Sequence, residues 1–237
     1  MNTKIQQRRA TLFVTPQINL TEEILPKYIS EFSNLGLLPS INKGLGIKFT
    51  TQGIEPEEVI SLDLKILDDT LKVSFGPDRV DIVSTKESET WDSFRNTAMR
   101  ISFILRNTMN LRINRLALCA SVSFVLEQGI GNIAYGRLTS TEEKPVEWQI
   151  RKVVRSSIKT LDNKQAIINE VLTITRNDIN INEKNLGDVL NVEFDINTLV
   201  GTSIDTINTV EELFWVSSAS QIENGISSYK AVFDSWQ

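Results

Sequence analysis

The sequence contains no histidine and a single cysteine, Cys119. Histidine is the most common general base and the most common ligand of transition metals, so its absence excludes histidine-based catalytic dyads and triads and every zinc site that includes histidine. One cysteine excludes an all-cysteine metal site and an internal disulfide, and it fits a reducing compartment. The chemistry that remains is that of carboxylate, lysine, arginine or tyrosine side chains, or of magnesium bound by oxygens.

Long apolar runs are also missing. Residues 1–10 are polar, and no later run is apolar for long enough to be a signal peptide or a membrane span. We therefore expect a cytoplasmic protein with no membrane partner.

The 237 residues are 41% hydrophobic and 23% charged, an ordinary globular composition that allows one large domain or two small ones. Because the net charge is −5, nucleic acid would have to bind to a local basic surface.

One stretch, 93–126, has no acidic residue and forms the predicted centre of the fold. Its first half has apolar residues at spacings of three and four, which predicts a helix. Its second half alternates with a period of two from Leu116 to Phe124, which predicts a strand. Because neither face of this strand is charged, we expect both faces to be covered.

The same stretch carries five arginines: Arg95, Arg100, Arg106, Arg112 and Arg115. With the nearby Arg151, Lys152 and Arg155 they are candidates for binding RNA or DNA. On a helix that turns about 100° per residue, Arg95 and Arg106 fall roughly 20° apart, whereas Arg100 lies on the order of 140° from Arg95. A phosphate-binding surface needs its cations on one face, so the alternative is that these arginines flank a buried face and pair with acids.

The rest of the pattern predicts an α+β fold with two antiparallel-sheet units, each a β-meander followed by a long helix packed on the sheet. Alternating strands between residues 60 and 82 lead into the acid-free helix. A polar run ending at Pro145 separates them from further alternating strands and a last helix. The predicted domains are 1–138 and 145–237, and the similar order of elements suggests an old duplication.

The last helix carries a long apolar stripe. Asn208 with Glu211 fits a capping box, as does Thr209 with Glu212, and either pair predicts where the helix begins. The stripe steps by four and three through Trp215, Ala219, Ile222, Ile226, Tyr229, Phe233 and Trp236. It can pack on the sheet of its own domain, or it can dock a partner through Trp215, Ile222, Tyr229 and Trp236. Gly225, in mid-helix, indicates close packing.

No motif in the sequence concentrates catalytic or metal-binding chemistry. Ser156-Ser-Ile-Lys159 matches a serine–lysine pattern of penicillin-recognising enzymes, but that pattern needs a helix and the context here is a strand. Paired acids fall in turns or at a helix start, where solvation or capping explains them. We predict no catalytic residue, no metal site and no cofactor.

Five short segments occur in a fixed order along the chain. They are Phe75-Gly-Pro-Asp-Arg79 in the meander, Trp91-Asp-Ser-Phe94 at the start of the helix, Ile113-Asn-Arg115-Leu-Ala-Leu118 in the central strand, Val192-Glu-Phe-Asp195 in an acidic strand and Phe233 in the last helix. In this order the chain resembles a sporadically distributed bacterial family of uncharacterised proteins of about this length. The resemblance spans most of the chain and supports the architecture, but it implies no reaction and no site residues.

These features favour a non-catalytic binding or assembly protein of a bacterial multi-protein system, by analogy with phage-defence or toxin–antitoxin systems. Such a protein would bind a protein partner or associate with itself into an oligomer. Two alternatives remain open. One is an RNA- or DNA-binding protein that uses the acid-free stretch, and the other is a metal-dependent hydrolase that uses carboxylates and magnesium.

Overall fold

The computed structural model describes residues 2–50, 53–127, 129–145, 147–160, 163–176, 180–181, 184–185 and 188–236. The helices are α1 (Leu25–Ser33), α2 (Trp91–Asn107), α3 (Ile130–Thr139) and α4 (Ile204–Asp234). The strands are β1 (Asn2–Thr15), β2 (Leu38–Thr50), β3 (Gly53–Lys65), β4 (Leu71–Phe75), β5 (Arg79–Ser84), β6 (Arg112–Leu126), β7 (Trp148–Lys159), β8 (Gln165–Arg176), β9 (Asn180–Ile181), β10 (Lys184–Asn185) and β11 (Asp188–Thr198). None of the described helices is long and apolar enough to span a membrane.

Nine strands form one antiparallel sheet in the order β2-β3-β4-β5-β1-β6-β11-β8-β7, and β9 pairs with β10 in a separate ladder. The predicted α+β class with antiparallel strands is confirmed, but the prediction of two sheet units is wrong. The reason is that β1 pairs with β6 along almost its whole length, from Asn2 opposite Val125 to Thr15 opposite Arg112. This pairing merges the two expected sheets into one.

The element order nevertheless repeats. In each half a first strand, β1 or β6, is followed by a short helix, a meander whose last strand pairs back with the first strand, and a long helix. The two first strands lie side by side in the middle of the sheet, and the first strands of the two meanders, β2 and β7, form its edges. The repeat divides the chain between α2 and β6. The predicted boundary between residues 138 and 145 falls in the connection from α3 to β7, and separate folding of 1–138 and 145–237 stays a prediction.

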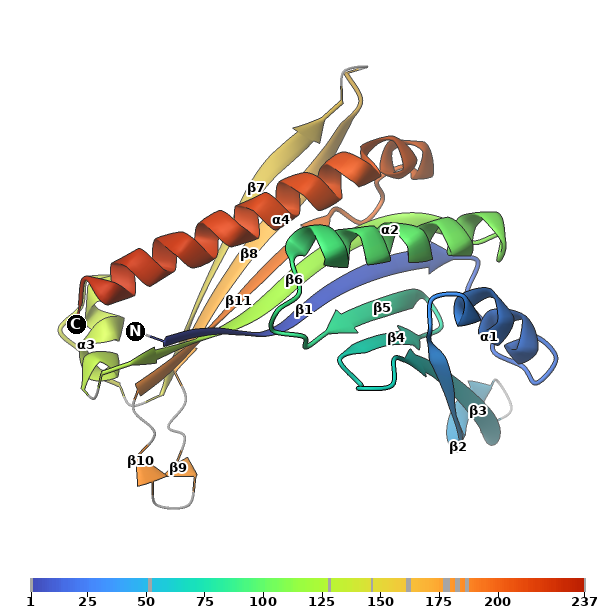
Figure 1. Ribbon diagram of the computed structural model, residues 1–237, viewed down its shortest axis with the longest axis horizontal. Coiled ribbons are helices and arrows are strands. Elements are labelled where there is room, and N and C mark those ends of the chain that lie inside the picture. The colour runs from blue at the N-terminus through green and yellow to red at the C-terminus, as the bar shows by residue number, and fades with distance from the viewer. Residues whose placement is uncertain are drawn as a thin grey trace.

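The long helices α2 and α4 lie on the same face of the sheet, with α1 and α3 towards its two ends (Figure 1). On this helix face, β6 presents a row of fully or almost fully buried side chains: Leu116, Leu118, Ala120, Val122 and Phe124. Trp215, Ile222 and Phe233 of α4 pack against the sheet with no exposed surface. A fully buried side chain of this size contributes roughly 1.5–3 kcal/mol, so the seam between α4 and β6 is a main source of stability.

The opposite face of the sheet is called the open face here, and on β6 it is formed by Ala117, Cys119, Ser121 and Ser123. No helix of the described part lies on it. We expected both faces of β6 to be covered because both are uncharged. Ala117, Cys119 and Ser123 are buried all the same, and Ser121 is partly buried, because longer neighbours in the same layer shield them. The Arg9 guanidinium, for example, donates to Cys119 Sγ at 3.5 Å.

Helix α4 begins earlier than its capping pattern predicts. The N-cap is Ser203, whose hydroxyl accepts a hydrogen bond from the Thr206 backbone N–H at 3.1 Å. Asn208 therefore lies inside the helix, and Glu211 has a buried role instead. Gly225 does mark close packing, as predicted: a Cβ atom there would lie 2.5 Å from Cε1 of Phe194 on β11.

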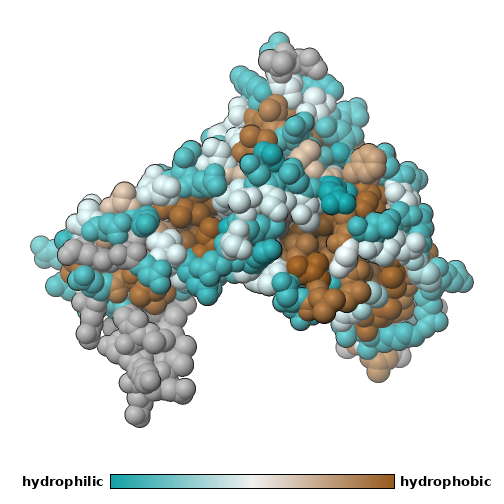
Figure 2. Space-filling model, viewed as in Figure 1, coloured by the Kyte–Doolittle hydropathy of each residue, from teal (hydrophilic) through white to brown (hydrophobic). Residues whose placement is uncertain are grey.

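The hairpin of β2 and β3 extends beyond the rest of the sheet as an arm, because β4 pairs only with the last four residues of β3, Leu62–Lys65. Along the arm Ile41, Leu45 and Ile54 are exposed apolar side chains. Figure 2 shows apolar surface gathered at this end of the molecule.

Candidate docking surface

The arginines of α2 lie on the helix side of the sheet, and two of them are paired with acids. Arg95 contacts Asp92 one turn earlier at 3.3 Å, whereas Arg100 is exposed. Arg106 Nη1 lies 2.5 Å from Oε2 of Glu211 on α4. This last contact joins the two long helices.

Glu211 is a buried carboxylate, 7% exposed, with partners on both helices. Its Oε1 accepts hydrogen bonds from the Ser102 hydroxyl at 2.6 Å and from Trp215 Nε1 at 3.3 Å, while Oε2 faces Arg106. The three donors satisfy a group that would be costly to bury alone. Arg106 therefore acts in the packing of α2 against α4, which is the structural alternative that the sequence left open.

The remaining predicted cations are spread over both sides of the sheet. Arg112 is exposed at the start of β6. Arg115 lies on the open face, where its guanidinium stacks 4.7 Å from the centre of the Phe13 ring and donates to the Thr198 carbonyl and to Asn197 Oδ1, both at 3.0 Å. Arg151 and Arg155 of β7 point to the open face as well, whereas Lys152 points to the helix face. Of the predicted set, Arg115, Arg151 and Arg155 thus share the open face, with β11 and β8 lying between Arg115 on β6 and the two arginines on β7.

The apolar stripe of α4 faces the sheet of this chain. Trp215 and Ile222 have no exposed surface, so they offer none to a partner. Tyr229 and Trp236 are partly exposed at the C-terminal part of the helix, and the Arg137 guanidinium lies 5.5 Å from the centre of the Trp236 ring. Only this end of the predicted partner-binding set remains accessible.

Strand β7 is an edge of the sheet, paired on one side only, with β8. The register runs without a shift over 12 residues, from Trp148 opposite Arg176 to Lys159 opposite Gln165. Half of the backbone N–H and C=O groups of such a strand point away from the sheet, where they can pair with another strand. We call this strand the β7 edge. Its position at the edge of the sheet was not predictable from local sequence, because it depends on which strands pair.

The β7 edge is strongly basic. It carries Arg151, Lys152, Arg155 and Lys159 and no acidic residue. All four side chains are exposed, and none of them forms an ion pair with another residue of the described ranges. In a chain with a net charge of −5, this concentration of unpaired positive charge is a local feature of one strand.

Apolar side chains accompany these cations. Val153 and Val154 are 45% and 43% exposed on opposite faces of β7, and Ile167 on the neighbouring strand is 45% exposed. On the helix face a groove of about 220 Å³ runs between α4 and strands β7, β8 and β11. It is lined by Lys152, Val154, Glu170, Val171, Leu172, Phe194, Ile196, Gln221, Gly225 and Tyr229. The missing side chain at Gly225 and the accessible Tyr229 contribute to its wall.

Across the whole open face, cations outnumber acids among the described residues. The cations are Lys4, Arg9, Lys65, Lys72, Arg79, Arg115, Arg151, Arg155 and Lys159, and the acids are Glu55, Asp63, Asp81, Glu193 and Asp195. Near the middle of the sheet acids and cations pair, as with Asp81 and Arg79 at 3.1 Å. The excess that is free of such pairing is concentrated on β7.

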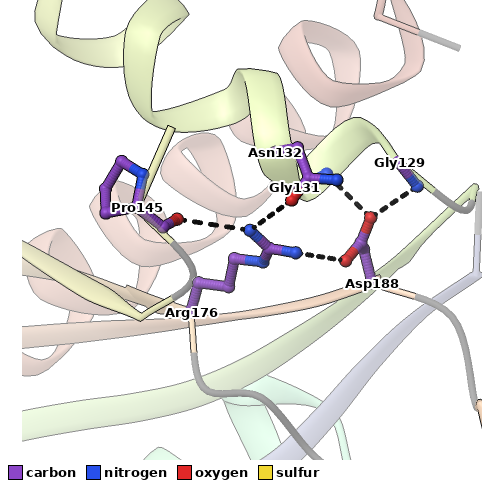
Figure 3. Close-up of polar contacts among 6 residues, drawn as sticks. All are labelled: Gly129, Gly131, Asn132, Pro145, Arg176 and Asp188. Atoms are coloured by element: carbon purple, nitrogen blue, oxygen red, sulfur yellow. Dashed lines mark hydrogen bonds and ion pairs between the residues drawn. The ribbon is translucent and has the colours of Figure 1, made fainter. Parts of the chain in front are cut away.

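A second buried ion pair, at the end of the sheet near α3, is structural (Figure 3). Arg176 Nη2 lies 2.8 Å from Asp188 Oδ1, and Asp188 Oδ2 accepts from the backbone N–H groups of Gly129 at 2.7 Å and Gly131 at 3.0 Å. Arg176 Nη1 also donates to Asn132 Oδ1 at 3.1 Å. The carboxylate thus neutralises the N-terminus of α3 and holds the helix on the sheet.

Three groups of residues bear on catalytic chemistry: the acidic side chains, the serine–lysine pattern and Cys119. Among them, no three acidic or cysteine side chains are grouped so as to hold a metal ion. Ser156 donates a hydrogen bond to Glu170 on the helix side, and Lys159 lies on the open side, so the serine–lysine pattern is not assembled. Burial, followed by the nearby Asp195 carboxylate, raises the pKa of the Cys119 thiol to about 12.

Comparison with known proteins assigns the chain to no family. No protein-family model matches the sequence, and no curated protein matches it.

Proposed function

We propose that this protein is a non-catalytic binding protein that assembles with a protein partner through the β7 edge. The partner would contribute an extended, acidic segment that pairs with β7 as an additional strand of the sheet. The observation that carries the proposal is a free, regular edge strand of 12 residues with four cations and no acid. Strand addition of this kind takes its affinity from main-chain hydrogen bonds and its specificity from side chains.

Charge complementarity identifies the chemistry of the partner. Alternate residues of a strand point to opposite faces, so Arg151 and Arg155 lie on one side of β7 and Lys152 on the other. An added strand of alternating acidic and apolar residues would place its carboxylates beside Arg151 and Arg155 on the open face and its apolar side chains beside Val154 on the helix face. Cross-strand pairs of opposite charge contribute about 0.2–1 kcal/mol each, and like charges in the same places are unfavourable. The strand therefore favours an acidic partner over a basic one.

Charged residues on an edge strand also have a protective role, because they discourage edge-to-edge aggregation. That role alone does not account for β7. Val153 and Val154 leave nearly half of their surface exposed beside the cations, and a groove with apolar walls opens next to Val154. An added strand would cover the valines and could place an apolar side chain in the groove.

The proposal can be tested with a defined probe. A fluorescent decapeptide of alternating Glu and Val would be titrated with the full chain, and binding followed by anisotropy. We expect binding that weakens with salt and is lost in the double variant Arg151→Glu, Arg155→Glu. Both side chains are exposed, so the variant is expected to fold. Lys27→Glu on α1 reverses the charge of an exposed residue far from β7 and controls for charge reversal elsewhere on the surface.

Two results of this titration would contradict the proposal. The proposal is overturned if an alternating Lys and Val peptide binds as well as the acidic one. It is also overturned if the double charge reversal leaves binding of the acidic peptide unchanged.

A second candidate function is the binding of RNA or DNA on the open face. It is favoured by the excess of cations on this face, which includes Arg115, Arg151 and Arg155. Phosphate contacts make binding strongly dependent on salt, so single-stranded and duplex oligonucleotides should be tested at several salt concentrations. Tight, salt-sensitive binding that is lost on Arg115→Ala with Arg155→Ala would favour this candidate over the protein partner.

We propose further that the partner is a component of a bacterial multi-protein system, by analogy with phage-defence or toxin–antitoxin systems. The support is the order of segments in which the sequence resembles the bacterial family of uncharacterised proteins. Co-purification with the products of neighbouring genes, followed by light scattering, tests this context. A monomer that retains none of those products would contradict it.

A further inference from the structure

A separate cleft lies on the helix side, between α4 and the N-terminus of α2, above β1. Its larger part measures about 520 Å³ and is lined by Ile5, Arg8, Glu89, Thr90, Trp91, Glu223, Asn224, Ile226 and Ser227. A second part of about 220 Å³ shares Thr90, Trp91 and Glu223 with it and extends towards Val216 and Ala219. The shared residues make the two parts one cleft, which we call the Arg8 cleft. It lies on the other side of α4 from the groove beside the β7 edge, which Gln221, Gly225 and Tyr229 of the same helix line.

Arg8 forms part of the cleft wall although its side chain is 3% exposed. Its Nη1 donates to the Lys86 carbonyl at 3.1 Å, and its guanidinium lies 5.2 Å from the centre of the Trp91 ring. Its Nε is buried and has no hydrogen-bond partner among the described residues. A buried donor without a partner costs about 1–3 kcal/mol, so this group requires an explanation.

Two carboxylates face the same cleft. Glu89 and Glu223 act on Arg8 through space and oppose the lowering of its pKa, which burial dominates. Neither lies within ion-pair distance of Arg8 in the described structure, and Oε2 of Glu89 is buried without a hydrogen-bond partner. The cleft thus presents one cation and two anions that are close but not joined to one another.

This charge pattern selects a class of ligand. A purely anionic ligand would be attracted by Arg8 but repelled by both carboxylates, and a purely cationic ligand would have the opposite conflict. A ligand that carries both charges a few atoms apart satisfies both groups. The remaining walls include Ile5, Trp91, Val216 and Ala219, which suit an apolar body.

We propose that the Arg8 cleft binds a small zwitterion, a free α-amino acid with an apolar side chain. The ligand carboxylate contacts the Arg8 guanidinium, and the ligand ammonium lies between Glu89 and Glu223. The apolar side chain lies against Trp91 or reaches towards Val216. None of the residues that line this site belongs to β7.

The test uses the full chain and isothermal titration calorimetry with three matched probes. They are L-leucine, isopentylamine (leucine without its carboxylate) and 4-methylpentanoate (leucine without its ammonium). We expect L-leucine to bind at least about tenfold more tightly than either fragment, because a hydrogen bond between charged groups is worth about 1.5–3 kcal/mol and about 1.4 kcal/mol is tenfold. The two fragments test the roles of Arg8 and of the carboxylates without any change in the protein.

A protein variant tests the same site by removing one of its charges. Glu223 is exposed on α4, so Glu223→Gln is expected to fold and to weaken L-leucine by at least about tenfold. Glu212→Gln, an exposed acid on the same helix and outside the cleft, should bind as wild type. Absence of heat with L-leucine, equal affinity for either fragment, or full affinity in Glu223→Gln would each overturn the proposal. None of these results bears on the β7 edge, which has its own probe.

Discussion

The role of Glu211 in the structure differs from the role that its position in the sequence suggests. Its spacing from Asn208 resembles a helix cap, but its carboxylate is buried and accepts from Ser102, Trp215 and Arg106. Replacing it with glutamine removes the charge that Arg106 requires. We expect Glu211→Gln to lower the free energy of unfolding by about 2–3 kcal/mol in urea denaturation, less than for a fully buried pair because Arg106 is a quarter exposed. The neighbouring exposed acid provides the control, since Glu212→Gln should change it by less than about 0.5 kcal/mol; equal effects would show that the buried network is not stabilising.

Cys119 gives a prediction about pH. Because burial raises the pKa of its thiol to about 12 from the ordinary 9.0, the thiol stays protonated in the folded protein at pH 8. Iodoacetamide should therefore label Cys119 slowly in buffer and rapidly in guanidinium chloride.

The unfolded chain loses the proton of the Cys119 thiol first as the pH rises, so this thiol favours the folded state below pH 9 and loses that contribution between pH 9 and 12. The free energy of unfolding should fall more steeply over this window in wild type than in Cys119→Ala, and parallel curves would contradict the assignment.

At the scale of elements, the contact between α4 and β11 depends on Gly225. A Cβ atom at this position would lie 2.5 Å from Cε1 of Phe194, which is itself packed near Tyr229. Alanine improves helix propensity by about 1 kcal/mol, but overpacking costs about 1–3 kcal/mol. We expect Gly225→Ala to destabilise the protein by about 1 kcal/mol net in a thermal or urea unfolding experiment. Ser228→Ala on the exposed side of α4 has a smaller propensity gain without the clash, and the proposed packing is excluded if Gly225→Ala is stabilised as much as Ser228→Ala or more.

The sequence predicts those elements whose pattern is local. Strand β4 is recognisable because its apolar residues alternate, and α2 and the body of α4 because theirs recur every three or four positions. Helix α3 was not predicted, because only Gly131 and Ala134 of it are buried and its N-terminus is held by Asp188, 59 residues after Gly129. The start of α4 was misplaced because a capping pattern does not reveal a buried partner on another helix.

At the scale of the whole molecule, the sequence could not reveal that one sheet runs through both halves. The pairing of β1 with β6 joins strands about a hundred residues apart, and no local pattern encodes it. The same limit applies to the candidate site. Arg151 and Arg155 were recognised as candidates from composition, but the edge position of β7 and the adjoining groove depend on the strand order.

The continuous sheet leads to a prediction about folding. Dividing the chain at residues 138 and 145 would separate β6 from β11 and remove α4 from its place on β6. We therefore expect a single cooperative transition in guanidinium chloride, with coincident midpoints by far-UV circular dichroism and tryptophan fluorescence. Two separated transitions would instead support independent domains at 1–138 and 145–237.

Hydrogen exchange along β7 tests the central claim most directly, because strand addition protects the outward-facing backbone amides of the edge. With the alternating Glu and Val peptide bound, amides between Trp148 and Lys159 should exchange more slowly than in the free protein, while those of β2 at the other edge should not change. The double variant Arg151→Glu, Arg155→Glu should show no such protection. Peptide binding that leaves β7 exchange unaltered, or that protects β2 equally, would contradict the account.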